Sequence, residues 1–174
     1  MLEQPGAERI TTAALAARLE VSEAALYRHF ASKAQMFEGL IAYIEQTVFL
    51  LVNQIVAREE GNGLRQVGKV VAMVMQFAEK NPGLSRVMVG DALVFENERL
   101  QQRMNLFFDK IEATLKQSLR SIDVTRDSST PTVDAQVRAS VITAFLVGRL
   151  QRYARSGFKR LPSEHLEASL ALML

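Results

Sequence analysis

The 174-residue chain has no cysteine and no tryptophan, and it contains only four prolines and two histidines. Without cysteine there can be no disulfide and no thiolate metal site. His29 and His165 lie far apart in the sequence and suggest no metal pair. We therefore expect neither a metal nor a cofactor.

Long hydrophobic runs and strand patterns are also missing. No apolar run approaches the roughly 20 residues that a transmembrane helix needs. The first residues, MLEQPGAE, lack the basic start and the apolar core of a signal peptide. No alternating segment is flanked by hairpin turns. We expect a soluble, cytoplasmic, all-α protein with no membrane partner.

Neither sign of charge is in large excess, because the formal net charge is only +2. The chain is not a bulk polycation, so any contact with nucleic acid must come from a local patch. We find no nucleophile with an adjacent base, no glycine loop for phosphate and no metal-ligand spacing. The sequence predicts a protein that is not an enzyme.

Helix-forming residues are abundant, and the apolar positions follow a helical period. The side chains of Thr11 or Thr12, Ser22 and Ser32 are predicted N-caps. A polar surface loop is expected over 121–132, and Ser163 is expected to cap the last helix. The expected helices cover 13–19, 23–30, 33–56, 64–80, 84–89, 92–119, 133–156 and the chain from 164 onward.

The first two expected helices form a compact head over residues 1–36, and residues 37–174 form a larger bundle. Leu15 and Leu19 share one face of the first helix, Leu26 and Phe30 share one face of the second, and Val21 is expected to fill the gap. Two short helices joined by a tight turn make a helix-turn-helix, whose second helix fits a DNA major groove about 12 Å wide. A plain helical hairpin in a core is the alternative.

The DNA contacts predicted in the head are short, hydroxyl-bearing or basic side chains. Short side chains allow close approach to bases, and hydroxyl, imidazole and ammonium groups suit phosphates. Between Arg9 and Lys33 four basic residues stand against two Glu, which is a modest excess. The predicted DNA-binding residues are Arg9, Thr11, Thr12, Ser22, Ala24, Ala25, Tyr27, His29 and Lys33.

The run V-S-E-A-A-L-Y-R-H-F-x-S-K-x-x-M-F, from Val21 to Phe37, resembles the signature of the TetR family. Three further segments, RITTAALA (9–16), NPGLSRVMVGDALVFENERLQQRMN (81–105) and RSGFKRLP (155–162), are similar to one branch of that family. Proteins of this branch bind palindromic duplex DNA as dimers, assemble further on DNA, and antagonise the division protein FtsZ. The resemblance implies a nucleoid-associated nucleoid occlusion factor.

The resemblance also implies a partner groove and shows three departures from the family pattern. The groove for FtsZ lies between the helices that begin at Lys33 and Leu64, with Tyr43, Met73, Gln76, Lys80 and Asn81 as its residues. The family's first helix is represented only by residues 1–3, and Glu20 stands where Gly is usual, at a cost of about 1 kcal/mol if φ is positive. Leu51 replaces an arginine that FtsZ would contact.

A stripe of small and apolar residues on the helix 133–156 is the predicted dimer interface. A glycine such as Gly148 inside a helix costs about 1 kcal/mol relative to Ala, so it needs a packing reason. Packing within the chain is the alternative to a two-fold interface. The stripe consists of Val137, Val141, Ala144, Phe145, Gly148 and Arg152.

The alternative function is a ligand-responsive transcriptional repressor with a small-molecule pocket in the bundle. Methionine and phenylalanine side chains at helical spacing would line that pocket, but the same residues are equally typical of a plain core. We expect no small-molecule ligand. The residues concerned are Met73, Met75, Phe77, Met88, Met104 and Phe107.

Overall fold

The computed structural model describes residues 1–4, 10–125 and 130–174, and within these ranges the chain is all-α. The predicted fold class is confirmed. Residues 5–9, among them the predicted DNA contact Arg9, lie outside the described residues, as does the segment 126–129. The helices are α1 (Thr12–Arg18), α2 (Glu23–His29), α3 (Lys33–Arg58), α4 (Gly63–Lys80), α5 (Pro82–Met88), η2 (Asp91–Leu93), α6 (Glu98–Thr125), α7 (Pro131–Arg155) and α8 (Leu166–Met173).

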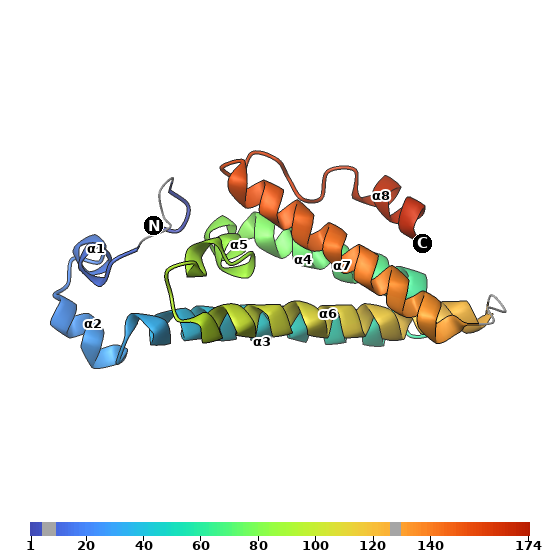
Figure 1. Cartoon of the computed structure of the whole chain (residues 1–174), viewed down its shortest axis with the longest axis horizontal. Helices are drawn as coiled ribbons and strands as arrows, with labels where there is room; N and C mark the ends of the chain where they lie inside the picture. The colour runs from blue at the N-terminus through green and yellow to red at the C-terminus, as the bar shows by residue number, and fades with distance from the viewer. Residues whose placement is uncertain (5–9, 126–129) are drawn as a thin grey trace.

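The long helix α3 joins the head to the bundle (Figure 1). Helices α1 and α2 sit at its N-terminal end, and α6 runs beside it for most of its length. Helices α4 and α7 cover this pair, and α8 packs on α4 and α7. Because one unbroken helix carries the head, the position of α2 relative to the bundle is set at the base of α3.

The core is built from apolar stripes at helical spacing on α3, α4, α6 and α7. Ile41, Ile44 and Val48 on α3 are fully buried, and Phe107 on α6 packs edge-on against Phe49 and Phe108. On α7 the apolar positions with no exposed surface are Ala135, Ala139, Ile142, Leu146 and Leu150. These are different positions from the predicted interface stripe, so α7 carries two apolar faces.

Helix α3 is long and apolar enough to cross a membrane by length and composition alone. Core helices of soluble proteins pass the same test, and α3 contributes a fully buried stripe to the core. Its length and composition are therefore weak evidence for a membrane span.

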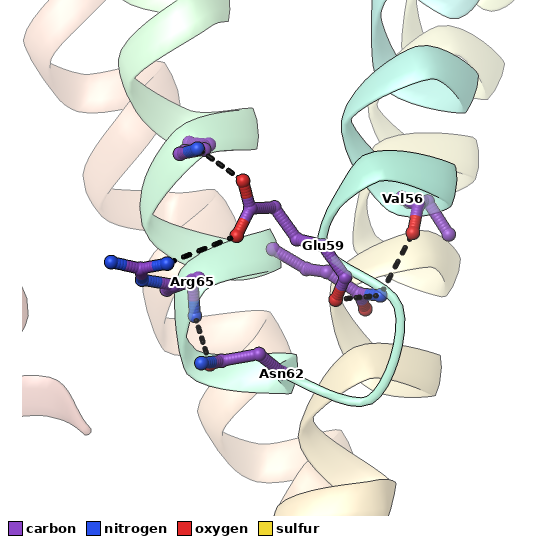
Figure 2. A network of polar contacts seen from close by, with 6 residues as sticks. Val56, Glu59, Asn62 and Arg65 are labelled. Carbon is purple, nitrogen blue, oxygen red and sulfur yellow. Dashed lines mark hydrogen bonds and ion pairs between the residues drawn. The ribbon is translucent and has the colours of Figure 1, made fainter.

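The corner between α3 and α4 is fixed by polar contacts (Figure 2). The Asn62 side chain accepts a hydrogen bond from the Arg65 amide and caps α4. Buried Gln66 donates to the carbonyls of Val56 and Glu59, at 3.1 Å each. A hydrogen bond from Lys69 to the Glu59 carboxylate, aided by the charges of Lys69 and Arg65, holds the pKa of Glu59 below its ordinary value.

The predicted start of the helix over 92–119 is wrong. Gly90 has φ +83°, and the chain makes the short turn η2 before α6 begins at Glu98. The Asn97 side chain accepts a hydrogen bond from the Arg99 amide at this start. Phe95, which falls inside the helix expected over 92–119, lies in the connection and is 69% exposed.

The loop expected over 121–132 is also wrong at both ends. Helix α6 continues to Thr125, and Ile122 is buried in the core. Helix α7 begins at Pro131, at the first helical position, where the missing N–H of proline has no cost. The four residues 126–129 between the two helices are not described.

The last helix begins later than predicted. Ser163 does not cap it, because its hydroxyl and its amide both bond the Glu79 carboxylate of α4. His165, with φ +57° and no side-chain capping bond, precedes α8 instead. A tertiary contact has replaced the local cap.

Candidate nucleic-acid interface

The helix starts of the head form at the predicted caps. Thr11 accepts a hydrogen bond from the Ala14 amide, and Ser22 accepts one from the Ala25 amide, each at 3.1 Å. Ser32 accepts from the Gln35 amide at 3.2 Å and starts α3. Each cap satisfies an amide that has no partner within its helix. These confirmed caps fix where α2 begins and therefore which side chains it presents.

A chain of hydrogen bonds ties α2 to the start of α1. Thr12 donates from its hydroxyl to the Glu23 carboxylate at 2.8 Å, and Tyr27 donates to the Thr12 oxygen at 3.4 Å. Two predicted DNA-binding side chains therefore lie together on one surface. Glu23 was not predicted as a site residue. An acidic residue in the first turn of a helix is also typical of a helix-dipole partner, so residue type alone does not indicate the contact with Thr12.

The outer side of α2 is accessible. Ser22, Ala24, Tyr27 and His29 are exposed, and Ala25 is half-buried. Arg28 is exposed as well, although it was not predicted as a site residue. Its type and its place on α2 are a signal that sequence reasoning could have used. A helix with small side chains at its start and longer polar ones along it suits insertion into a groove.

The turn between the helices has the strain that its sequence implied. Glu20 has φ +55°, in the left-handed region that favours glycine. The amides of Leu19, Glu20 and Val21 all bond carbonyls of α1, so the turn is closed despite the side chain. The helix-turn-helix forms with Glu at this position.

The apolar side of the head is less covered than predicted. Ala16 and Leu26 are buried where α1 meets α2, but Leu19, Val21 and Phe30 are exposed. Helices of seven residues bury little beyond their mutual contact. Beside them lies a largely apolar hollow of about 330 Å³, lined by Met1, Leu2, Ile10, Thr11, Thr12, Leu15, Arg18, Leu19, Lys33, Met36, Phe37 and Leu40.

Lys33, a predicted phosphate contact, is bound to the bundle. Its ammonium group forms an ion pair with Glu96, which is largely buried, and lies 5.8 Å from the centre of the Phe37 ring. Glu96 is 63 residues away in sequence, so no local signal could have revealed it. Nearby, Arg99 pairs with Glu38 at 2.6 Å and Arg103 with Glu45 at 2.5 Å. These pairs hold the base of α3 against the start of α6.

The predicted partner-groove residues lie on two helices and one junction. Tyr43 on α3 is exposed, and Met73, Gln76 and Lys80 follow a spacing that places them on one side of α4. Asn81 joins α4 to α5, and its side chain donates to the Phe77 carbonyl. Gln76 lines a hollow between α4 and α8, whereas Lys80 and Asn81 line another with residues 1–3, Gly83 and Leu84. The FtsZ groove stays a prediction.

The predicted dimer stripe has exposed residues. Val137 and Val141 are 57% and 50% exposed, Ala144 and Arg152 are exposed, and Phe145 is half-buried. At Gly148 an added Cβ would meet nothing within 4 Å. Close packing within the chain therefore does not explain this glycine.

Comparison with known proteins supports the geometry of both parts. Residues 1–40 match the model described as bacterial regulatory proteins of the tetR family. Residues 61–174 match the SlmA-like model described as a tetracyclin repressor-like C-terminal domain. The residues between the two matches, 41–60, cover most of α3 and the two residues after it.

Several relatives carry the name nucleoid occlusion factor SlmA. The protein of Idiomarina loihiensis is 47% identical over 173 residues, which cover 99% of this chain and 87% of that protein. The proteins of Vibrio vulnificus strain YJ016 and Vibrio cholerae are each 47% identical over 174 residues, covering 99% of this chain and 88% of the relative.

A solved structure supports the fold. The transcriptional regulator FadR from Bacillus subtilis, in complex with stearoyl-CoA, superposes with a TM-score of 0.72 at 14% identity. The match covers 97% of this chain and 89% of FadR. At this identity the likeness speaks for the fold alone. Together, the two family matches and the full-length relatives show that this chain belongs to the TetR family of DNA-binding bacterial regulators, in its SlmA-like branch, and is not an enzyme.

Proposed function

We propose that this protein is a sequence-specific DNA-binding nucleoid occlusion factor that inhibits FtsZ assembly. The observation that carries the proposal is the 47% identity to proteins named nucleoid occlusion factor SlmA, which runs through the head and the bundle alike. TetR regulators that share only the head would support DNA binding but not a role in division. The proposed location is the cytoplasm, on the nucleoid.

The proposed DNA contacts are the predicted residues on α2 and at the start of α1. These contacts are supported by the accessible side of α2 and by the hydrogen bonds that link Thr12 to Glu23 and Tyr27. Tyr27 presents its ring at 45% exposure, with a hydroxyl already oriented by Thr12. Arg9 lies outside the described residues and remains a proposed contact on sequence grounds.

The proposed active form is a homodimer on a palindromic site, with further assembly on DNA. The exposed apolar positions of α7 and the open space at Gly148 support the packing of a second copy against this face of α7. A two-fold axis there would place two copies of α2 about 34–36 Å apart, one turn of DNA.

The proposed FtsZ contact uses Tyr43, Met73, Gln76, Lys80 and Asn81. Tyr43, Gln76 and Lys80 are exposed and have no ion pair or hydrogen-bond partner among the interactions of the described residues. Leu51, where related proteins carry arginine, is half-buried and adds no charge to this surface.

The test is sedimentation of FtsZ polymer with the purified protein and its cognate duplex. We expect the protein to pellet with FtsZ and to reduce polymer more strongly when the duplex is present. Tyr27→Ala should keep the helical signal and lose the enhancement by DNA, because it removes a proposed contact with duplex and, within the chain, only the hydrogen bond to Thr12. If the wild-type protein shows no association with FtsZ under any of these conditions, the division role is wrong and DNA binding alone remains.

The alternative is a ligand-responsive repressor. FadR was solved with stearoyl-CoA, but that likeness extends only to the fold. Of the residues proposed to line a pocket here, Met75, Met88, Met104 and Phe107 are fully or almost fully buried in the core. The hollows described above are lined by other side chains. A metabolite that both raises thermal stability and releases DNA would favour this alternative.

A further inference from the structure

The densest positive charge of the chain lies on the bundle, not on the head. From Ala135 to Ser163 there are six Lys/Arg and no Asp/Glu, and five of the six fall between Arg149 and Arg160. In the head, by contrast, Lys33 is paired with Glu96, which leaves Arg18 and Arg28 as its exposed cations among the described residues. Proteins gain much of their affinity for duplex from neutralised phosphates, so this imbalance needs an explanation.

Four of the five charges are available at the surface. Arg149 is occupied, because its guanidinium donates to the carbonyls of Pro162 and Glu164 and stacks on Phe145. Arg152, Arg155, Lys159 and Arg160 are exposed, and they form no ion pair among the interactions of the described residues. The carboxylates that share hollows with them are Asp91 and Glu164.

The segment that carries Lys159 and Arg160 is held in place. The Ser156 hydroxyl oxygen accepts hydrogen bonds from both of their amides, at 3.1 and 3.0 Å, and donates to the Tyr153 carbonyl. Phe158 packs edge-on against Tyr153, with 5.2 Å between ring centres. The two cations are therefore presented from a fixed turn, which reduces the entropy lost when they bind.

One more cation, Arg86 of α5, lies against the same segment. Its guanidinium lies over the Phe158 ring at 5.5 Å, and its buried Nε has no hydrogen-bond partner. Arg86 and Arg155 together line a hollow of about 320 Å³ with Asp91, Val94 and Ala154. We call Arg86, Arg155, Lys159 and Arg160 the basic corner.

The turn that follows α7, which carries two cations of the basic corner, lies on the head side of the bundle. Helix α7 runs from the far end of the bundle back towards the side where α1 and α2 project, and the turn after Arg155 lies at that end (Figure 1). Three of the four cations are arginines, whose planar guanidinium matches a phosphate with paired hydrogen bonds. We infer that the basic corner binds the phosphate backbone of duplex DNA, as a contact that is independent of sequence and additional to the head.

The test measures the salt dependence of binding to a long duplex with the full-length chain, by fluorescence anisotropy. Each lost phosphate contact lowers the slope of log affinity against log salt by about 0.9. We expect Lys159→Gln with Arg160→Gln to lower the slope by about 2 and to weaken affinity about tenfold at fixed salt, equally for cognate and random duplexes. Arg155→Gln alone should lower the slope by about 1.

The matched control is Arg58→Gln with Arg120→Gln. It removes the same charge from exposed side chains on α3 and α6, towards the other end of the bundle, and it should leave the slope unchanged. Circular dichroism and particle mass should match the wild type in every variant. Equal loss in both double variants would mean a general charge effect, and an unchanged slope in the corner variants would mean no contact. Either result overturns the inference. It is also overturned if the corner variants bind duplex as the wild type does and lose only binding to polyglutamate, an acidic polymer without phosphate.

Two sources of phosphate are separable in the same experiment. If the corner contacts the flank of the duplex held by the head, the variants differ from wild type only on duplexes longer than the site. If it contacts a second duplex, wild-type protein brings two differently labelled duplexes within energy-transfer distance and the corner variants do not. Both results support a phosphate contact and identify which DNA supplies it.

Discussion

At the scale of single residues, three side-chain caps, one backbone position with positive φ and one ion pair shape the head. Thr11, Ser22 and Ser32 cap their helices as their side chains and their places before apolar runs implied. Glu20 adopts the positive φ that the turn requires. The bond between Lys33 and Glu96 joins residues far apart in the chain, so only the fold could show it.

Glu20 gives the first prediction at this scale. Because its φ of +55° strains any residue with a Cβ, Glu20→Gly should stabilise the head by about 1 kcal/mol. The hydrogen bond from the amide of residue 20 to the Ala17 carbonyl does not depend on the side chain and should persist. Chemical denaturation should show a higher midpoint, and affinity for the cognate duplex should be equal or higher.

The control for Glu20→Gly is Glu23→Gln, which keeps the helix but weakens the Thr12 bond. It should not raise the denaturation midpoint, since it relieves no backbone strain. A Glu20→Gly variant less stable than wild type would show that the Glu20 side chain contributes more than its strained backbone costs.

At the scale of elements, the sequence predicted which helices exist better than where they end. Helical periodicity separated the elements, and the structure places Gly61, with φ +76°, between α3 and α4 and Pro82 at the start of α5. The ends failed where tertiary contacts overrode local signals. Ile122 is buried in the core, and α6 continues past it. The Ser163 hydroxyl donates a hydrogen bond to Glu79 and does not cap α8. Such contacts cannot be read from neighbouring residues.

The contact between α4 and α6 gives the second prediction, through Gly63. A Cβ at this position would lie 2.2 Å from the Ser118 carbonyl oxygen and 2.9 Å from Ile122. Since a backbone atom of α6 must move, Gly63→Ala should destabilise the protein by about 1–3 kcal/mol. The free energy of unfolding in urea measures the effect, with the slope against urea unchanged.

Gly68 on the same helix is the matched control. A Cβ there would meet nothing within 4 Å, and Gly inside a helix costs about 1 kcal/mol relative to Ala. Gly68→Ala should therefore stabilise the protein where Gly63→Ala weakens it. The same sign for both variants would mean that helix propensity, and not the approach of α6, decides the effect.

At the scale of the whole molecule, the candidate site was predictable in its location and only partly in its arrangement. The exposed side of α2 and the exposed stripe of α7 follow from residue type and spacing. The partly exposed apolar side of the head does not, because coverage depends on how many elements surround Leu19, Val21 and Phe30. The positive charge of the bundle corner depends on the path of α7 back towards the head.

The two apolar faces of α7 lead to the last prediction, which concerns assembly. One face is the core stripe, and the other presents Val137 and Val141 to solvent in the single chain. If a second copy covers this other face, Val141→Glu places two carboxylates near a two-fold axis, where their burial and repulsion oppose association. The variant should be monomeric by sedimentation velocity at micromolar concentration, with unchanged helical signal.

Leu106→Glu on α6 is the matched control, because Leu106 is exposed to a similar degree, at 57%. It should stay dimeric, since it lies outside the predicted stripe. Dimer loss should also lower affinity for a palindrome towards that for a half-site, because the two recognition helices no longer bind as a unit. A Val141→Glu protein that remains dimeric would move the interface away from this face of α7 and would leave Gly148 without a packing reason.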